Sequence, residues 1–444
     1  MASRILAAPA QSPKYICDSC LSGARSLRSR QVHAPRLFST GSSPTLNSTA
    51  QRKCPRLQDE RSSIAVPAAH NSFSKPRAAS RLYSTEASTA QAIASGIAPL
   101  PHRSLIFLSG PTASKFLHGL ITHDASRVSP FYAAFLDARG RVLCDVFIWT
   151  WPELIAKEGH WACHIEVDTS VAENLRMHLM RHKLRHKLTI THVPAEGSNG
   201  IKVWAAWGGA HTQVKDWSEI VGMQDPRAPG MYRYLANADR ERIAGDMQPV
   251  DAKFYNVQRY IHGVPEGPAE MPPYGTLPLE ANIDLYGGID FKKGCYIGQE
   301  LTIRTKHTGV VRKRILPVRF HAGGAGVADP DAPVDPAFVP QPQQGMDIRT
   351  LDDTGALGKG RPTGRIIAAI GNVGIATCRI ENMTNIRVST EGGFFKEGTQ
   401  FGVDVDGEVV RVEPVVHDHF RERKEAVWGS GEKLRKSWVE KQEE

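Results

Sequence analysis

Long hydrophobic runs are missing from this chain of 444 residues. No stretch of eighteen or more uncharged apolar residues occurs in it, so the sequence predicts no membrane span. Hydrophobic residues make up 41% of the chain and charged residues 23%, which is typical of a globular protein with a packed core. At this length we expect two or three domains.

Cysteine is also scarce, with seven residues in the whole chain. Three of them lie near the N-terminus, including the only CxxC motif, CDSC at 17–20. The other four are too far apart in sequence to form a ligand spacing: Cys144, Cys163, Cys295 and Cys378. This pattern excludes a disulfide scaffold and indicates a reducing compartment.

Acidic residues are rare in residues 1–83, which contain three of them against 13 Lys and Arg and are rich in Ser, Ala and Pro. Such a composition is typical of a mitochondrial transit peptide, with a disordered basic arm as the alternative. RLFST (36–40) and RLYST (81–85) resemble matrix-protease cleavage sites. We therefore expect a mitochondrial matrix protein whose mature chain begins near Ser39 or Ser84.

The formal net charge of +9 depends on this leader. Without it, 42 basic and 43 acidic residues remain. The mature chain is therefore near neutral, and its charge predicts no nucleic-acid partner.

Hydrophobic periodicity predicts an α+β protein. After a linker of small residues at 84–101, SLIFLSG (104–110) is typical of a buried strand, and FYAAFLDARGRVLCDVFIW (131–149) predicts a hairpin that turns at 137–140. NLRMHLMRHKLRHKLTITHV (174–193) predicts an amphipathic helix and then a strand. We assign residues 102–309 to one folded region.

Short β runs dominate the remainder of the chain: RILPVRF (314–320), GRIIAAIG (364–371), GIATCRI (374–380) and FGVDV (401–405). They predict a C-terminal antiparallel β-barrel or sandwich over residues 310–420. A Pro-, Gly- and Ala-rich insertion at 322–345 is expected to be disordered, and residues 421–444 are expected to form a charged tail or frayed helix.

His178, His182 and His186 follow one another at four-residue spacing, which could place them on one helix face as metal ligands. Lysines and arginines crowd the same segment, and no acidic residue supports the imidazoles. A solvated basic helix face is the favoured interpretation.

The most distinctive stretch is KKGCYIGQE (292–300). QELTIRTKHTG (299–309) predicts a helix, so Cys295 is expected at or just before its N-terminus. There the helix dipole and the charges of Lys292 and Lys293 would favour a thiolate. Gln299 offers a donor and an acceptor beside the sulfur, and Glu300 is a first-turn acid.

Several functions fit such a thiolate: a nucleophile with His307 as base, a persulfide carrier, a redox sensor or a metal ligand. A buried structural cysteine is the alternative. An iron–sulfur cluster usually takes four protein ligands, so a cluster bound by Cys295 would need ligands from another protein.

The segment 278–309 closely resembles the signature of the YgfZ/GcvT-related family. Its core motif is matched by Lys293, Gly294, Cys295, Tyr296, Gly298, Gln299 and Glu300. Further matches are the segment 110–124, the hairpin 135–148, DPR at 225–227, and Arg259 with Gly263. Together they cover most of residues 102–380.

This resemblance implies a three-part, ring-like T-protein fold with a C-terminal β-barrel. It also implies a mitochondrial assembly factor for [4Fe–4S] proteins. Cys295 would then share or receive a [2Fe–2S] or [4Fe–4S] cluster, the partners being A-type carriers and client [4Fe–4S] apoproteins.

The same fold occurs in folate-dependent aminomethyltransferases, which makes a tetrahydrofolate-dependent transferase the alternative. The resemblance marks Asp145 and Arg259 as candidate folate contacts. Cys144 stands where those enzymes carry the first of two acids, and Ile261 stands where their pterin-binding Glu is expected. Loss of these carboxylates favours a non-enzymatic assembly factor and predicts weak folate binding.

Overall fold

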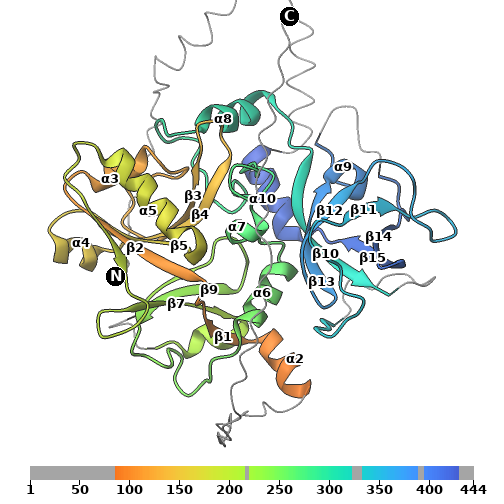
Figure 1. The fold of residues 1–444 in the computed structure, drawn as a ribbon, viewed down its shortest axis with the longest axis horizontal. Coiled ribbons are helices and arrows are strands. Elements are labelled where there is room, and N and C mark those ends of the chain that lie inside the picture. Colours follow the sequence, from red (N-terminus) through yellow and green to blue (C-terminus); the bar gives the residue numbers. More distant parts are fainter. Residues whose placement is uncertain (1–85, 216–219, 323–332, 389–394, 430–444) are drawn as a thin grey trace, which may run out of the picture. The chain divides into compact units, whose positions relative to one another are not determined.

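The computed structural model describes residues 86–215, 220–322, 333–388 and 395–429, and the predicted transit peptide lies outside these ranges. Two antiparallel sheets and a closed antiparallel barrel form the described part (Figure 1). Helices and strands are mixed along the chain, which confirms the α+β class. None of the helices in the described ranges has the length and apolarity needed to cross a membrane.

The five-stranded sheet has the order β3-β4-β5-β2-β6. Its strands are β2 (Arg103–Ser109), β3 (Phe131–Leu136), β4 (Val142–Trp149), β5 (Ala162–Asp168) and β6 (Thr189–Val193). Their connections contain α3 (Ala113–His118), α4 (Pro152–Glu158) and α5 (Thr169–Lys183). The predicted hairpin is thus confirmed as β3 and β4.

Both faces of this sheet are buried at β3, because successive side chains of a strand point to opposite faces and both sets are apolar here. Phe131, Ala133 and Phe135 join one core cluster, together with residues of α3 and α5. Tyr132 and Ala134 join the second cluster on the other face.

The four-stranded sheet has the order β1-β7-β9-β8. It contains β1 (Gly96–Pro99), β7 (Ile201–Trp207), β8 (Ile220–Gln224) and β9 (Met231–Asn237), with the 3₁₀-helix η1 (Gly208–Gln213) after β7.

The linker expected at 84–101 is wrong for its described part, which contains α2 (Glu86–Ala94) and β1. Gly96 pairs with Trp207, and a Cβ on Gly96 would come within 2.5 Å of the indole ring. Ile97 and Ala98 are fully buried. The small residues therefore permit close packing, which a composition-based prediction cannot distinguish from flexibility.

Helix α6 (Ala252–Ile261) connects the four-stranded sheet with the barrel, because it contacts β1 and β7 as well as β10 and β13 (Figure 1). Asp251 caps its N-terminus by accepting a hydrogen bond from the backbone of Lys253. Helices α7 (Gly267–Glu270) and α8 (Gln299–Thr308) follow, and α8 confirms the helix predicted after the cysteine motif.

The barrel closes in the order β10-β13-β12-β11-β14-β15. Its elements are β10 (Lys313–His321), β11 (Asp347–Thr350), β12 (Gly364–Ile370), β13 (Val373–Arg379), α9 (Ile380–Met383), β14 (Phe401–Val405) and β15 (Glu408–Pro414). All four predicted β runs are strands. The sequence prediction missed β11, which is short, and β15, whose pattern is interrupted by charged residues.

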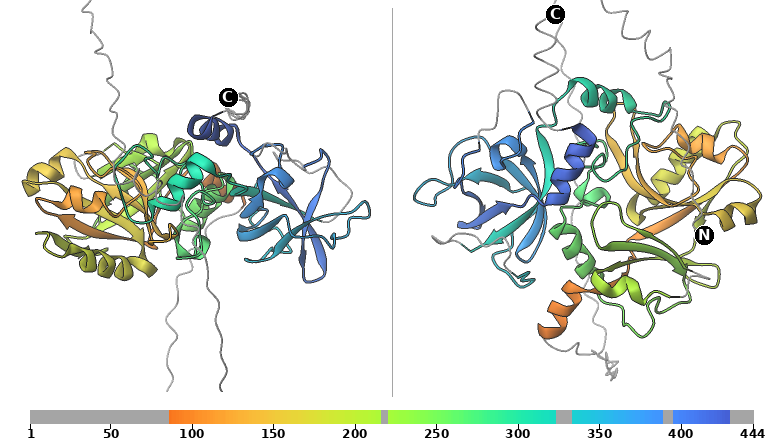
Figure 2. Two further views of the ribbon diagram at one scale, coloured as in Figure 1. Left: turned by 90° about the horizontal axis from the view of Figure 1, so that it is seen from above. Right: turned by 180° about the vertical axis from the view of Figure 1, so that it is seen from behind.

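Two predictions at the barrel need correction. Of the insertion 322–345, expected to be disordered, residues 333–345 are described and bound to the β12–β13 turn, where the backbone N–H of Asp335 donates to Asn372 Oδ1 at 2.7 Å. The tail or frayed helix expected from 421 is helical up to Trp428 and belongs to α10 (Asp418–Trp428), which begins earlier and lies beside the barrel in Figure 2. Residues 430–444 lie outside the described ranges. Phe420 is buried in the barrel core and Val427 and Trp428 pack against it, at the i, i+7, i+8 spacing of one helix face.

His164 on β5 gives this fold a testable pH dependence. Its ring lies between Phe107 and Trp151, and its Nδ1 has no hydrogen-bond partner within the described structure. Burial, with a smaller effect of the Lys157 charge, lowers the pKa of His164 from 6.5 to about 4. The unfolded chain therefore binds more protons between these values, and stability present above pH 6.5 is lost as the pH falls toward 4.

We expect the free energy of unfolding to fall between pH 7.5 and pH 5.5 by about 1 kcal/mol more in the natural protein than in His164→Phe. Phenylalanine keeps a ring between Phe107 and Trp151 but cannot be protonated. Urea unfolding of both proteins at the two pH values measures the difference. Equal pH dependence would show that His164 does not titrate in this way.

Candidate functional site

Cys295 lies in a loop that precedes α8 and is exposed, whereas Cys144, Cys163 and Cys378 are buried thiols. Burial raises the pKa of all three buried thiols, in the case of Cys378 to about 12. Among the four described cysteines, Cys295 is thus the one that a partner protein can reach. Its exposure removes the alternative of a buried structural cysteine.

Three residues separate Cys295 from the first residue of α8, so the thiol does not lie at the helix N-terminus itself. Gln299 begins the helix, and its Oε1 accepts a hydrogen bond from the backbone N–H of Tyr296 at 3.2 Å. Glu300 is exposed in the first turn, as expected. Helix α8 is ten residues long, about 15 Å, and His307 lies in its last turn. The proposed base is therefore at the far end of the helix from the loop.

Lys293 has a structural role that the sequence did not reveal. Its ammonium donates to the backbone carbonyls of His118 at 2.5 Å, Ile121 at 2.7 Å and His123 at 3.1 Å. It also lies 4.8 Å from the centre of the Tyr296 ring. Burial lowers the pKa of Lys293 from 10.5 to about 8. The lysine thus fastens the cysteine loop to the segment after α3.

Gly298 fastens the other end of the loop. It has φ of +80°, and a Cβ there would lie 2.3 Å from the carbonyl oxygen of Asp137. Gly140, with φ of +79°, packs from the β3–β4 turn onto the carbonyl of Gly298. Side chains at either position would clash with backbone, so two glycines hold the start of α8 against this turn.

The candidate folate residues are both buried and both paired with protein groups. Asp145 accepts a hydrogen bond from the backbone N–H of Gly267 at 3.0 Å and lies 3.5 Å from Arg103. Arg259 donates to both oxygens of Glu270, at 2.6 and 2.9 Å. Ile261 ends α6, and its carbonyl contacts His417 Nε2 at 2.7 Å. Among the described residues, the pairing capacity of Asp145 and Arg259 is thus largely used within the protein.

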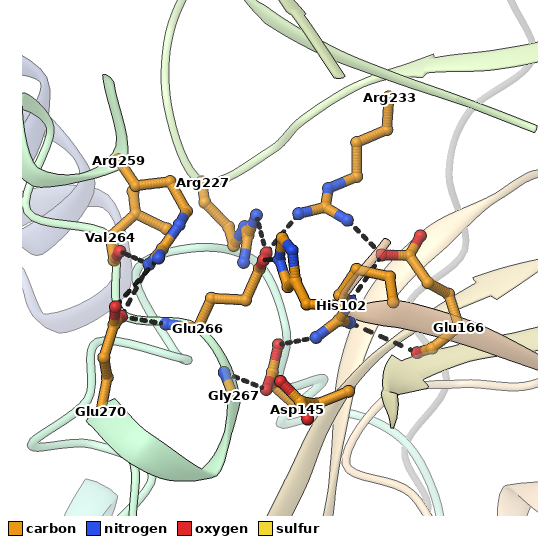
Figure 3. Close-up of polar contacts among 12 residues, drawn as sticks. His102, Asp145, Glu166, Arg227, Arg233, Arg259, Val264, Glu266, Gly267 and Glu270 are labelled. Carbon is orange, nitrogen blue, oxygen red and sulfur yellow. Dashed lines mark hydrogen bonds and ion pairs between the residues drawn. The ribbon is translucent and has the colours of Figure 1, made fainter. Parts of the chain in front are cut away.

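Asp145 belongs to a larger buried cluster of ion pairs, of which Figure 3 labels Asp145, Glu166, Arg227, Arg233 and Glu266. Its members come from β2, β4, β5, the 225–227 turn, β9 and the segment before α7: Arg103, Asp145, Glu166, Asp225, Arg227, Arg233 and Glu266. We call these seven residues the central ion cluster. Each is at most 5% exposed.

Glu266 is the most connected carboxylate of the central ion cluster. Its Oε2 accepts from Arg227 at 2.9 Å, from Tyr255 at 2.7 Å and from Arg233. Its Oε1 lies 3.1 Å from His102 Nε2. Burial opposes ionisation, but the guanidinium groups around it hold the pKa of Glu266 well below its usual value. The carboxylate is therefore charged and serves as a buried counter-ion.

The central ion cluster could hardly be predicted from the sequence. DPR at 225–227 was noted as a family match. In the structure it enters a turn, and Asp225 and Arg227 are buried and paired. The useful signal was arginine within apolar strands, at Arg103 before LIFL and at Arg233 in MYRYLAN. A charged residue at a core-facing strand position requires a buried partner.

The three histidines form no metal site, since no group of three or more His, Cys, Asp or Glu side chains within the described ranges is arranged to bind one. Helix α5 ends at Lys183, so His186 lies beyond it and contacts Thr112 at 2.9 Å. His178 and His182 are half-buried, with ring centres 4.3 Å apart. The expected solvated basic helix face is therefore only partly solvated at His178 and His182, and His186 does not belong to it.

Comparison with known proteins shows the family to which this chain belongs. Residues 312–414 match the family model described as the CAF17 C-terminal beta-barrel domain. The "Iron-sulfur cluster assembly factor IBA57 homolog, mitochondrial" of Phaeosphaeria nodorum is 82% identical over 393 residues, which cover 88% of this chain and 97% of the relative. The chain belongs to the IBA57 family. The protein of the same name from Coccidioides immitis is 40% identical over 68% of this chain and 76% of its own length.

Membership of the IBA57 family confirms the resemblance found in the sequence and the predicted mitochondrial location, because these relatives are named as mitochondrial proteins. Among solved structures, the glycine cleavage system aminomethyltransferase T from Bartonella henselae matches with a TM-score of 0.53. It is 13% identical, and the match covers 76% of this chain and 89% of that chain. At that identity the likeness shows a shared fold alone.

Proposed function

We propose that this protein is a mitochondrial iron–sulfur cluster assembly factor that supports the maturation of [4Fe–4S] proteins. In this proposal Cys295 receives or shares a cluster, of the [2Fe–2S] or [4Fe–4S] type, with an A-type carrier before the cluster reaches a client apoprotein. The observation that carries it is the exposed thiol of Cys295 on an anchored loop, while the three other described cysteines are buried.

The anchoring of the loop that carries Cys295 supports this function. A ligand that meets a cluster held by another protein must be exposed, yet its backbone must be ordered so that binding costs little conformational entropy. Lys293 and Gly298 supply that order on the two sides of Cys295. The family relationship supports the choice of cargo, since the relatives are named as iron–sulfur cluster assembly factors.

The remaining ligands are expected from the partner. Within the described ranges, no three potential ligand side chains are arranged to bind a metal ion. Because a cluster usually takes four protein ligands, a single chain of this protein should hold none stably. Cluster transfer would then need a complex with the carrier.

Anaerobic mixing tests this proposal. The full-length chain is mixed with a cluster-loaded A-type carrier, and also incubated alone with iron and sulfide. We expect visible absorption of a cluster to co-elute with both proteins in the mixture and no retained colour in the protein alone. A stable cluster on the protein alone, or no complex with the carrier, would contradict the proposal.

The tetrahydrofolate-dependent transferase is the second candidate, and the pairing of Asp145 and Arg259 argues against it. A pterin ring would need to compete with Gly267 and Arg103 for Asp145, and with Glu270 for Arg259. We therefore expect weak tetrahydrofolate binding and no aminomethyl transfer. Isothermal titration calorimetry measures the affinity. Low-micromolar binding that Asp145→Asn abolishes would instead favour the transferase.

A further inference from the structure

A histidine lies beside the cysteine loop with one ring nitrogen directed at it. His118 ends α3, and its Nε2 is 3.5 Å from the position that a Cβ on Gly294 would occupy. Gly294 immediately precedes Cys295, and its φ is not in the left-handed region that favours glycine. Because glycine has no side chain, no Cβ lies in front of this nitrogen. Among the described residues no hydrogen-bonding group contacts His118 Nε2.

Asp124 determines that the other ring nitrogen of His118, Nδ1, carries a proton. His118 Nδ1 lies 3.0 Å from Asp124 Oδ1, and Asp124 is itself bound by the backbone N–H of Ser126 at 2.9 Å and its hydroxyl at 2.7 Å. An ionised carboxylate only accepts hydrogen bonds, so Nδ1 carries a proton, and in the neutral ring the lone pair is then on Nε2. A carboxylate that orients a histidine in this way is the usual support of a metal-ligating imidazole.

A hydrogen bond also joins the cysteine loop directly to His118. Lys293 Nζ donates to the backbone carbonyl of His118 itself, at 2.5 Å. The residue two positions before Cys295 is thus bound to the residue that presents the imidazole. A partner that docks on the thiol meets both groups in a fixed arrangement.

We propose that His118, through Nε2, is a second ligand that this chain gives to the cluster bound by Cys295. The inference rests on the proposed function. Cys295 binds iron as a thiolate and releases its proton to solvent, and the imidazole binds as a neutral donor without releasing a proton. The two ligands displace two ligands of the carrier, and each displaced cysteine thiolate takes up a proton from solvent. Iron and sulfide keep their oxidation states, so no electron transfer is required for the exchange.

A mixed Cys and His ligand set predicts a spectroscopic signature. Histidine ligation raises the reduction potential of a [2Fe–2S] centre above that of an all-cysteine centre. It also places a nitrogen nucleus on the iron, which electron spin-echo spectroscopy of the reduced cluster detects. To assign that nitrogen, this chain is labelled with imidazole-¹⁵N histidine and mixed with an unlabelled, [2Fe–2S]-loaded A-type carrier.

We expect ¹⁵N coupling in the complex of the labelled natural chain, its loss in His118→Ala and His118→Gln, and about a 10-fold weaker complex in both. His123→Ala is the matched control. His123 lies in the same segment as His118, but its Nε2 faces Arg127 at 3.4 Å and its ring packs against Phe131. The ¹⁵N coupling and the affinity for the carrier should therefore be retained in His123→Ala.

The outcomes separate this inference from the proposed function. If Cys295→Ser still forms the complex with the carrier, the proposed function fails. If Cys295→Ser abolishes the complex but the labelled natural chain shows no ¹⁵N coupling, only the role of His118 is overturned. Coupling that persists in His118→Ala has the same meaning, since another histidine would then be the ligand.

Discussion

Cys295→Ser is expected to abolish the coloured complex with a cluster-loaded carrier, while the protein itself stays folded. A serine hydroxyl is far less acidic than a thiol and a much poorer ligand for iron, so one shared ligand is lost. The side chain is exposed, and the substitution should change the free energy of unfolding by no more than about 0.5 kcal/mol. Visible absorption after size-exclusion chromatography and a thermal melt measure the two quantities.

The buried cysteines provide the controls. Cys163→Ala and Cys378→Ala remove thiols that are fully buried in the core clusters and cannot reach a partner. They are expected to form the complex as the natural protein does, with some loss of stability. A Cys295→Ser protein that still forms the complex, and still restores [4Fe–4S] enzymes in cells that lack the natural protein, would show that the sulfur is not a ligand.

Local patterns in the sequence predicted most of the regular structure. Short apolar runs predicted the hairpin of β3 and β4 and four barrel strands, and the run after Gly298 predicted α8. These elements depend on neighbours a few residues away. The segment 86–99 was misassigned because its small residues are also what a close approach to Trp207 requires.

The site was predicted only in part, because its decisive contacts are distant in sequence. The cysteine and its motif were evident, but the carbonyls that bind Lys293 precede it by 170 to 175 residues. His118 was equally hidden, since nothing in its own segment indicates that Gly294 lies beside it. For the same reason the sequence suggested that Lys293 acts on the thiolate, whereas in the structure its ammonium contacts three backbone carbonyls and the Tyr296 ring.

The central ion cluster makes Arg233 the position where one substitution should destabilise the fold most. Arg233 is fully buried, lies over the Phe147 ring at 4.3 Å, and pairs with both Glu166 and Glu266. The central ion cluster holds three guanidinium groups and four carboxylates. Arg233→Met preserves much of the volume but leaves two guanidinium groups to compensate four buried carboxylates.

We expect Arg233→Met to lower the free energy of unfolding by about 3–5 kcal/mol, as measured by urea denaturation at pH 7.5. Removing one partner of a buried ion pair leaves the other charge desolvated and uncompensated, which costs more than the pair contributed. Arg176→Met is the matched control. Its partner Glu173 is exposed on α5, where solvent screens the pair, so no measurable change is expected.

A second substitution tests whether charge is the cause. Adding Glu266→Gln to Arg233→Met removes one of the two carboxylates that Arg233 bridged, while the amide can still accept from Arg227 and Tyr255. The double variant should therefore be more stable than Arg233→Met alone, although Glu266→Gln by itself should destabilise the natural protein. This non-additivity is expected of residues that share one buried network. Additive losses would show that Arg233 stabilises the core by packing on Phe147 and Tyr255, with little contribution from its charge.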